Sequence, residues 1–170
     1  MEVIAISALA LSLIEGVILL MILRELAALR GTSTSRGIDV EGALPEFRVE
    51  DSEGRIVTAG DLSKRVVLFV SAECGPCHQL VAQGAHLDGP TVVVLSSKAK
   101  VDRTGPFVAK VRALGPEHLI FDDERLFAQL LQAPGTPFAY VIDAQGRVRS
   151  KEVPQSVAQL GRLAVRARAS

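Results

Sequence analysis

The sequence contains few aromatic or sulfur-bearing residues. Among its 170 residues there is no tryptophan, aromatic residues make up 4%, and there are two methionines and two cysteines. The hydrophobic core must therefore be built mainly from aliphatic side chains. An excess of one charge is also missing, because 19 basic residues balance 19 acidic residues. This balance argues against nucleic-acid binding, which requires clustered positive charge.

The hydropathy of the chain is high for a wholly soluble protein. Hydrophobic residues make up 48% of the sequence, and the mean hydropathy is +0.30. A chain of this length has room for one domain and an appendage. The longest apolar stretch is residues 3–23, which contain one charged side chain, Glu15. As a helix this stretch would extend for roughly 31 Å, about the thickness of the hydrocarbon core of a membrane.

We therefore expect residues 1–30 to form a single-pass transmembrane anchor with a short helical extension. The apolar side chains favour insertion by about 0.3–0.6 kcal/mol each, which outweighs the cost of about 2.5–3.5 kcal/mol for one central acid. A cleaved signal peptide fits less well, because no small-x-small cleavage site precedes the polar region. Residues 31–42 begin with small, polar side chains and are predicted to be a flexible linker. The soluble domain is predicted at 43–170.

The soluble domain is predicted on the extracytoplasmic side of the membrane, with the cytoplasmic face as the alternative. Arg24, Arg30 and Arg36 follow the apolar stretch, and the positive-inside rule alone would keep them in the cytoplasm. That rule is weaker when a long domain follows the span, and Glu25 lies among the arginines. The two signals conflict, and the sequence leaves both orientations open.

Both cysteines belong to one C-x-x-C motif, Cys74 to Cys77, directly after the apolar run 66–70. Such a run predicts a buried strand. A helix predicted at 76–86 then places Cys74 just before the helix and Cys77 in its first turn, where Pro76 is tolerated. Helix N-terminal N–H groups favour a thiolate over a thiol. Cys74 is therefore the expected nucleophile of thiol–disulfide exchange, and Cys77 is the expected resolving thiol.

Three other interpretations of the motif compete with a redox dithiol. A structural disulfide is disfavoured, because so short a loop constrains the unfolded chain little. A zinc site would need a second pair of ligands at zinc-finger spacing, and none follows. With His78 the motif also matches the c-type haem pattern C-x-x-C-H, for which His86 or His118 would have to supply the second axial ligand. A metal- or haem-binding accessory domain is therefore the alternative function.

The rest of the pattern predicts strands that alternate with helices and also pair as hairpins, and hence a mixed sheet. Glycine-containing turns at 51–54 and 143–146 indicate the two hairpins. The remaining predicted strands lie at 47–50, 55–58, 91–95, 118–121, 138–142 and 147–149. The remaining predicted helices lie at 105–114, at 124–132 with Asp122 or Asp123 as cap, and at 154–167 with Pro154 near its first position.

This order of elements resembles the membrane-anchored thioredoxin-like proteins of the redoxin and cytochrome-biogenesis type. The resemblance covers about residues 43–167, and the thioredoxin-like protein of methylamine utilisation has a similar layout. It implies an α/β thioredoxin fold, with a mixed central sheet flanked by helices. The segments that carry it are Pro45-Glu46-Phe47, the turn 51–54, Cys74-Gly75-Pro76-Cys77, Gly135-Thr136-Pro137-Phe138, and Ile142-Asp143 followed by Gly146.

The resemblance also implies roles for residues around the cysteines. Pro137 is expected to be a cis proline beside the two sulfur atoms, which leaves the backbone of Thr136 open to pair with a substrate strand. Gly75 and Pro76 are expected to contact the substrate, and this pair is similar to that of reducing thioredoxins. The implied partners are a disulfide-containing protein and a redox protein in or near the membrane. No organic cofactor and no metal are implied.

Two positions depart from the family pattern. Glu73 stands where the family usually has tryptophan, and its carboxylate should disfavour the Cys74 thiolate and select among charged substrates. Leu68 stands at the strand position that carries a buried acid in thioredoxin, so the usual proton acceptor for Cys77 is missing. The predicted function is therefore a membrane-tethered thiol–disulfide oxidoreductase that reduces partner disulfides and is slower or more selective than a general reductase.

Overall fold

The computed structural model describes residues 16, 18, 19, 21, 37–84, 86–87, 89–96 and 100–169. By its internal contacts the chain divides into two units, Met1–Ser35 and Arg36–Ser170. The described residues of the first unit are helical and exposed, namely Gly16, Ile18, Leu19 and Met21. The rest of the predicted anchor lies outside the described residues. Within the described ranges, no helix is both long enough and apolar enough to cross a membrane.

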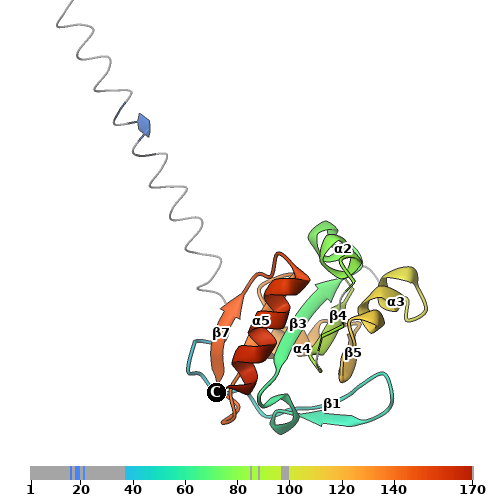
Figure 1. Cartoon of the computed structure of the whole chain (residues 1–170). Coiled ribbons are helices and arrows are strands. Elements are labelled where there is room, and N and C mark those ends of the chain that lie inside the picture. Colours follow the sequence, from blue (N-terminus) through green and yellow to red (C-terminus); the bar gives the residue numbers. More distant parts are fainter. Residues whose placement is uncertain are drawn as a thin grey trace, which may run out of the picture. The chain divides into compact units, whose positions relative to one another are not determined.

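A five-stranded mixed sheet forms the centre of the second unit (Figure 1). In the order β5-β4-β3-β6-β7, the strands are His118–Asp122, Thr91–Leu95, Val66–Ser71, Phe138–Ile142 and Val148–Glu152. Strands β3, β4 and β5 are parallel, whereas β6 is antiparallel to both β3 and β7. The mixed sheet predicted from the sequence is thus confirmed. All of β3 is buried, as its run of apolar residues predicts.

Helices cover both faces of this sheet, and each face has its own core. Helices α2 (Gly75–Ala82), α3 (Pro106–Ala113) and α5 (Val157–Arg168) pack on one face, together with Leu68 and Val70 of β3. Figure 1 shows α5 in front of the sheet and the fainter α4 behind it. The alternation of side chains along β3 therefore supplies both cores.

The second core lies between the sheet, α4 (Leu126–Leu130) and the amino-terminal hairpin. Strand β1 (Arg48–Glu50) pairs with β2 (Ile56–Thr58) in an antiparallel hairpin, and the 3-10 turn η1 (Gly60–Leu62) follows. Leu62 of η1 is fully buried in this core. The hairpin predicted around the turn 51–54 is confirmed.

Contacts with the sheet begin before the hairpin. Ile38 is buried, and its N–H donates a hydrogen bond of 2.9 Å to the hydroxyl of Tyr140 on β6. The N–H of Glu41 donates to the carbonyl of Val148 on β7 at 2.7 Å. These contacts lie ahead of residue 43, where the soluble domain is predicted to start. The division of the chain into 1–30, 31–42 and 43–170 stays a prediction.

Two helices are shorter than the sequence predicts, because residues with positive φ end them. Helix α2 stops at Ala82 instead of continuing to residue 86, and Gly84 follows with φ of +49°. Helix α4 was predicted at 124–132 but is flanked by Arg125 and Gln132, whose φ values are +59° and +52°. Left-handed residues cannot continue a right-handed helix. Asp122 nevertheless accepts a hydrogen bond of 2.7 Å from the N–H of Ala128 in α4.

The terminal helix begins later than predicted. It starts at Val157 and not at Pro154, because the hydroxyl of Ser156 accepts a hydrogen bond of 3.2 Å from the N–H of Gln159. Serine with glutamine three residues later is a capping-box pattern, so this start was visible in the sequence. Pro154 lies outside the helix, in the connection between β7 and the capping Ser156.

Candidate active site

The cysteine motif lies where the central strand leads into α2. Strand β3 ends at Ser71, and the N–H of Cys74 donates a hydrogen bond of 3.2 Å to the carbonyl of Ser71. Cys74 then caps α2, because its sulfur accepts a hydrogen bond of 3.2 Å from the N–H of Cys77. Gly75 and Pro76 form the exposed first turn of the helix. The predicted placement, with Cys74 before the helix and Cys77 in its first turn, is confirmed.

The two cysteines form a disulfide, and they differ in accessibility. Their Cα atoms are 5.2 Å apart. Cys77 is fully buried in the core beneath α2, whereas Cys74 is partly buried at its edge. An incoming nucleophile or disulfide can therefore reach the Cys74 sulfur, while Cys77 is shielded. In the reduced form, the helix N–H that points at Cys74 would favour its thiolate.

The loop before β6 completes this site from a distant part of the sequence. The Thr136–Pro137 peptide is cis, as the resemblance implies. Because β6 pairs with β3, with Phe138 opposite Phe69, the loop lies beside the end of β3. The carbonyl oxygen of Thr136 is 3.3 Å from the sulfur of Cys74. This contact is no hydrogen bond in the disulfide, whose sulfur carries no hydrogen, but a reduced thiol could donate one there.

Glu73 is held in place by two serine hydroxyls. Ser71, at the end of β3, donates a short hydrogen bond to its carboxylate, and Ser96, directly after β4, donates another at 3.2 Å. Because β3 and β4 are parallel, their carboxyl ends meet at the same edge of the sheet. Glu73 was predicted from the sequence and Ser96 was not, although the position of Ser96 after a parallel strand was a usable signal.

A cavity of about 190 Å³ opens beside Cys74. Its walls come from the ends of β3 and β4, from the loop before β6 and from the start of α4. The residues that line it include Ser71, Glu73, Cys74, Ser96, Arg125 and Thr136. No sequence pattern pointed to Arg125. Its left-handed conformation precedes α4, and such a conformation is usually recognised in a sequence by a glycine, which is absent here.

Leu68 and His78 complete the surroundings of the motif. Leu68 is fully buried in the same core as Cys77, so the side chain at this strand position is apolar. The His78 ring packs on Phe107 at a centroid distance of 4.8 Å. Its Nε2 lies 2.6 Å from the carbonyl of Ala72 and must carry a proton there, because a carbonyl only accepts.

The histidines required by the haem interpretation lie elsewhere. His118 is the first residue of β5 and is opposite Thr91, the first residue of β4, whereas Cys74 follows the last residue of β3. His86 lines a different cavity with Arg65 and Glu117, at the start of β3. Neither ring is at the end of the sheet where the motif lies. The positions of these two described histidines therefore contradict the prediction that His86 or His118 supplies the second axial ligand.

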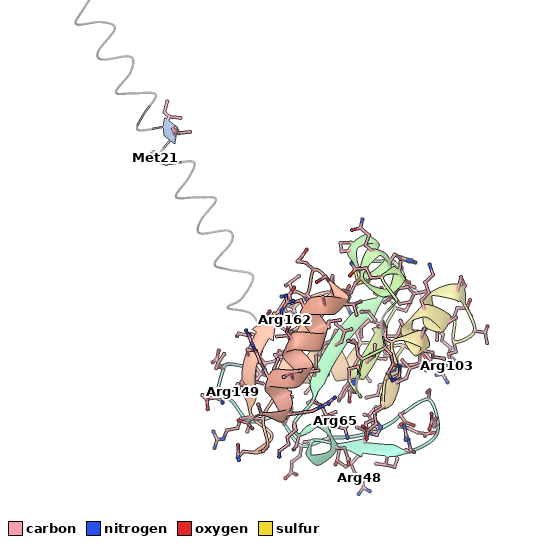
Figure 2. All side chains as sticks on the ribbon, viewed as in Figure 1. Met21, Arg48, Arg65, Arg103, Arg149 and Arg162 are labelled. Atoms are coloured by element: carbon pink, nitrogen blue, oxygen red, sulfur yellow. A yellow bond between two sulfur atoms is a disulfide. The ribbon has the colours of Figure 1, made fainter. Side chains whose placement is uncertain are left out.

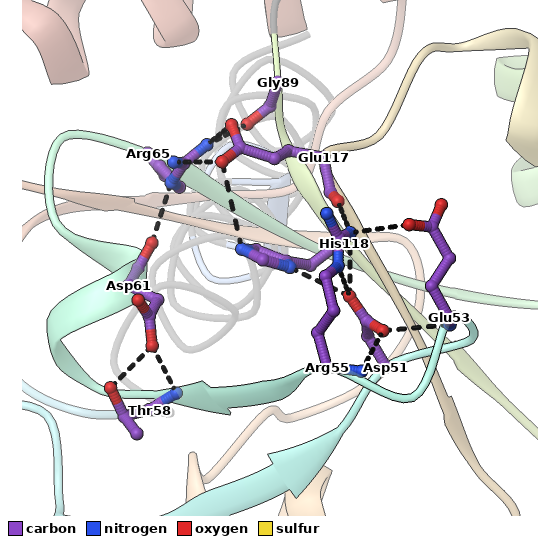
Figure 3. A network of polar contacts seen from close by, with 9 residues as sticks. All are labelled: Asp51, Glu53, Arg55, Thr58, Asp61, Arg65, Gly89, Glu117 and His118. Carbon is purple, nitrogen blue, oxygen red and sulfur yellow. Dashed lines mark hydrogen bonds and ion pairs between the residues drawn. The ribbon is translucent and has the colours of Figure 1, made fainter.

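His118 instead belongs to a polar network at the far end of the sheet (Figure 3). The carboxylate of Asp51 lies 3.0 Å from Nδ1 of His118 and accepts a hydrogen bond of 2.8 Å from Arg55. Burial alone would raise the pKa of Asp51. Hydrogen bonds from His118, Arg55 and the N–H of Glu53 outweigh burial and lower that pKa to about 2.

A second part of the network joins η1 to β5 across the start of β3. Arg65 forms a close ion pair with Glu117 and donates to the carbonyl of Asp61 at 2.7 Å. The hydrogen bond with Arg65 lowers the pKa of Glu117 more than burial raises it. Hydrogen bonds from Thr58 likewise lower the pKa of Asp61. The whole network ties the hairpin to the sheet (Figure 3). It lies at the start of β3 and β5, whereas Cys74 follows the end of β3.

Sheet order, helix placement, C-x-x-C motif and cis-proline loop together define a thioredoxin-like α/β protein. Solved structures share this fold. A thiol:disulfide interchange protein of the thioredoxin family from Chlorobium tepidum matches with a TM-score of 0.52 and 18% identity, over 78% of this chain and 97% of that chain. The thioredoxin domain of a thiol-disulfide oxidoreductase from Bacteroides vulgatus matches with a TM-score of 0.51 and 15% identity, over 76% and 97% of the two chains.

A further likeness is to a candidate thiol:disulfide interchange protein DsbE from Chlorobium tepidum, with a TM-score of 0.52 and 24% identity over 76% of this chain and 98% of that chain. At these identities the likeness shows the fold. No family model matches the chain, and no curated protein matches it.

Proposed function

We propose that this chain is a membrane-tethered thiol–disulfide oxidoreductase that reduces disulfides in partner proteins. The observation that carries the proposal is the Cys74–Cys77 disulfide at the start of α2, with Cys74 accessible beside Thr136 and Cys77 buried. The thiol–disulfide chemistry of the proteins with this fold supports it.

The reaction follows from the difference between the two sulfurs. The Cys74 thiolate attacks one sulfur of the partner disulfide, so that the partner S–S bond breaks and a mixed disulfide forms. The departing partner thiolate takes up a proton. Cys77 then loses its proton and attacks the Cys74 sulfur, which releases the second partner thiol and forms the Cys74–Cys77 disulfide. Two electrons pass to the partner, and a dithiol protein must supply two electrons to restore the reduced form.

The backbone at Thr136 is suited to hold the partner during these steps. Thr136 is partly exposed and its N–H forms no hydrogen bond with a described residue, while its carbonyl faces the Cys74 sulfur. An extended partner segment could therefore pair with this backbone and place its own sulfur next to Cys74. Gly75 and Pro76 are exposed on the other side of Cys74 and are proposed as further contacts.

The charge of Glu73 supports the reducing direction. A carboxylate near Cys74 destabilises its thiolate and hence the reduced form of the protein. A dithiol with a less stable reduced form passes its electrons on more readily. The Gly75–Pro76 pair, which is similar to that of reducing thioredoxins, points the same way.

Residues 1–30 are proposed to anchor this domain in the membrane, on its extracytoplasmic side, near a membrane redox partner. The low charge of residues 3–23 supports the anchor. The resemblance to redoxin and cytochrome-biogenesis proteins, including those of methylamine utilisation, suggests assembly of a cysteine-containing extracytoplasmic protein. A reporter active on only one side of the membrane, fused after Ser170, tests the orientation.

The reduction potential of the cysteine pair tests the activity. Thiol trapping of the full-length protein in redox buffers should give a value near that of thioredoxin, about −270 mV. A value near about −120 mV would contradict the reducing direction, because the protein would then act as an oxidant. If no disulfide forms at any buffer potential, the exchange reaction itself is wrong.

A further inference from the structure

The cavity beside Cys74 carries opposite charges on its walls. Glu73 directly precedes Cys74, and Arg125 comes from the start of α4. The Glu73 carboxylate is fixed by Ser71 and Ser96, so its position relative to Cys74 is set by the ends of two strands. A negative and a positive charge therefore lie near the sulfur on two different elements.

Arg125 is placed to act on a bound partner. Its side chain is exposed, and within the described residues it forms no hydrogen bond and no ion pair. The backbone of this residue is left-handed, with φ of +59°, a conformation that is unfavourable for a residue other than glycine. The positive charge of Arg125 therefore lies at the cavity and is not engaged by any ion pair or hydrogen bond within the described residues.

The neighbouring surface of α4 favours a polypeptide over a small thiol. Leu126 and Leu130 are one helical turn apart and are 62% and 43% exposed. They therefore lie on one side of α4, which begins directly after the cavity-lining Arg125. The segment from Arg125 to Thr136 both starts and ends at this cavity. Apolar side chains of an extended partner segment could pack on Leu126 and Leu130, whereas a small thiol is too short to cover both.

We infer that the pair of charges selects the order of charged residues around the partner's cysteine. This inference rests on the proposed function. The occupant is an extended, cysteine-bearing segment of another protein, with a basic residue on the side that meets Glu73 and an acidic residue on the side that meets Arg125. Pairing with the Thr136 backbone fixes the direction of the segment, so the reversed order brings like charges together.

Two blocked peptides of identical composition test this selection. One carries the order Lys-Ala-Cys-Ala-Glu and the other carries Glu-Ala-Cys-Ala-Lys, each used as its symmetric disulfide. The reduced full-length protein transfers two electrons to either peptide and releases two peptide thiols. One order should react about threefold to fivefold faster, the range expected for partly exposed charge pairs, and the difference should shrink at high salt.

Variants assign the selection to the two residues. Arg125→Gln should bring the ratio of the two rates towards one, and Glu73→Arg combined with Arg125→Glu should reverse it. Arg149→Gln is the matched control. Arg149 is exposed on β7 (Figure 2), and β6 separates β7 from β3, which leads into the cysteine motif. This variant should leave the ratio unchanged. Equal rates for both peptides, or a ratio that Arg125→Gln does not alter, would overturn the inference.

The uncharged 2-hydroxyethyl disulfide separates this inference from the proposed function. If the protein reduces it but treats the two peptides alike, charge selection is wrong and the oxidoreductase activity stands. If the protein reduces neither this compound nor the peptides, the proposed function is wrong and the inference fails with it.

Discussion

The two sulfur atoms have different surroundings, and each has its own consequence for exchange. Cys74 receives a helix N–H and is partly exposed, while Cys77 lies in the core with Leu68. The absence of an acid at Leu68 leaves Cys77 without a nearby carboxylate from that strand position. Resolution of the mixed disulfide should therefore be slow compared with its formation.

This asymmetry predicts that Cys77→Ala traps partner proteins and Cys74→Ala does not. With Cys77 absent, the mixed disulfide on Cys74 has no internal thiol to resolve it and should accumulate. Non-reducing electrophoresis followed by mass spectrometry measures the trapped species. Equal trapping by both variants would contradict the assignment of Cys74 as the attacking residue.

A second residue-scale prediction concerns Tyr140, the only tyrosine of the chain. Its hydroxyl accepts from the N–H of Ile38 and donates to the carbonyl of Leu131 at 2.8 Å. Burial raises the pKa of Tyr140, although the hydrogen bond from Ile38 opposes this, so the hydroxyl keeps its proton. Tyr140→Phe preserves the ring but leaves two buried groups unpaired.

We expect Tyr140→Phe to lower the free energy of unfolding by about 1–3 kcal/mol. Urea unfolding of wild type and variant measures the difference. The edge-to-face contacts with Phe69 and Phe138 survive in the variant, so the loss reports the hydroxyl alone. An unchanged midpoint would show that water replaces both hydrogen bonds without cost.

At the scale of elements, the hairpin β1–β2 depends on the ionised form of Asp51. The pKa of this carboxyl is about 2 in the folded chain and is higher in the unfolded chain. Its contribution is therefore present above the ordinary pKa of about 3.9 and is lost as the pH falls towards 2. The loss should be about 2.6 kcal/mol at most.

Asp51→Asn should remove this part of the pH dependence between about pH 4 and pH 2. Unfolding by urea at several pH values measures it. Glu53→Gln serves as the control, because Glu53 is exposed and its carboxylate is 3.5 Å from Arg55. If wild type and Asp51→Asn lose stability in parallel over this range, other carboxyl groups govern the acid response.

The elements also show which features the sequence could predict. Strands β3 and β4 are continuous apolar runs, and the residues around Cys74 and Thr136 form local motifs, so their types and order were accessible. Left-handed residues such as Arg125 and Gln132 shortened α4, and no glycine marked them. The position of Ser96 after a parallel strand gave a sequence signal for its hydrogen bond to Glu73. The Asp51–His118 pair joins residues 67 positions apart and could be found only in the folded chain.

At the scale of the whole molecule, redox state and stability are linked. The free energy of forming the disulfide differs between the folded and the unfolded chain. This difference equals the folding stability that the disulfide adds. A reducing protein has a folded state that favours the disulfide. A strong oxidant has a folded state that favours the dithiol.

The proposed reducing direction therefore predicts that the oxidised protein unfolds at a higher urea concentration than the reduced protein. The full-length chain, unfolded with and without a strong dithiol reductant, provides both midpoints. Cys74→Ala is the control, because the reductant should leave its midpoint unchanged. A reduced protein that is more stable than the oxidised one would mean that the chain acts as an oxidant.

The contact between the Thr136 carbonyl and the Cys74 sulfur gives the protein an internal optical marker of its redox state. In the disulfide the carbonyl faces a sulfur without hydrogen, whereas a reduced, protonated thiol would donate to it. A carbonyl that accepts a hydrogen bond absorbs infrared light at a lower frequency. Isotopic labelling of this one carbonyl would separate its band from those of the rest of the backbone, so that reduction of the pair could be followed without any added dye.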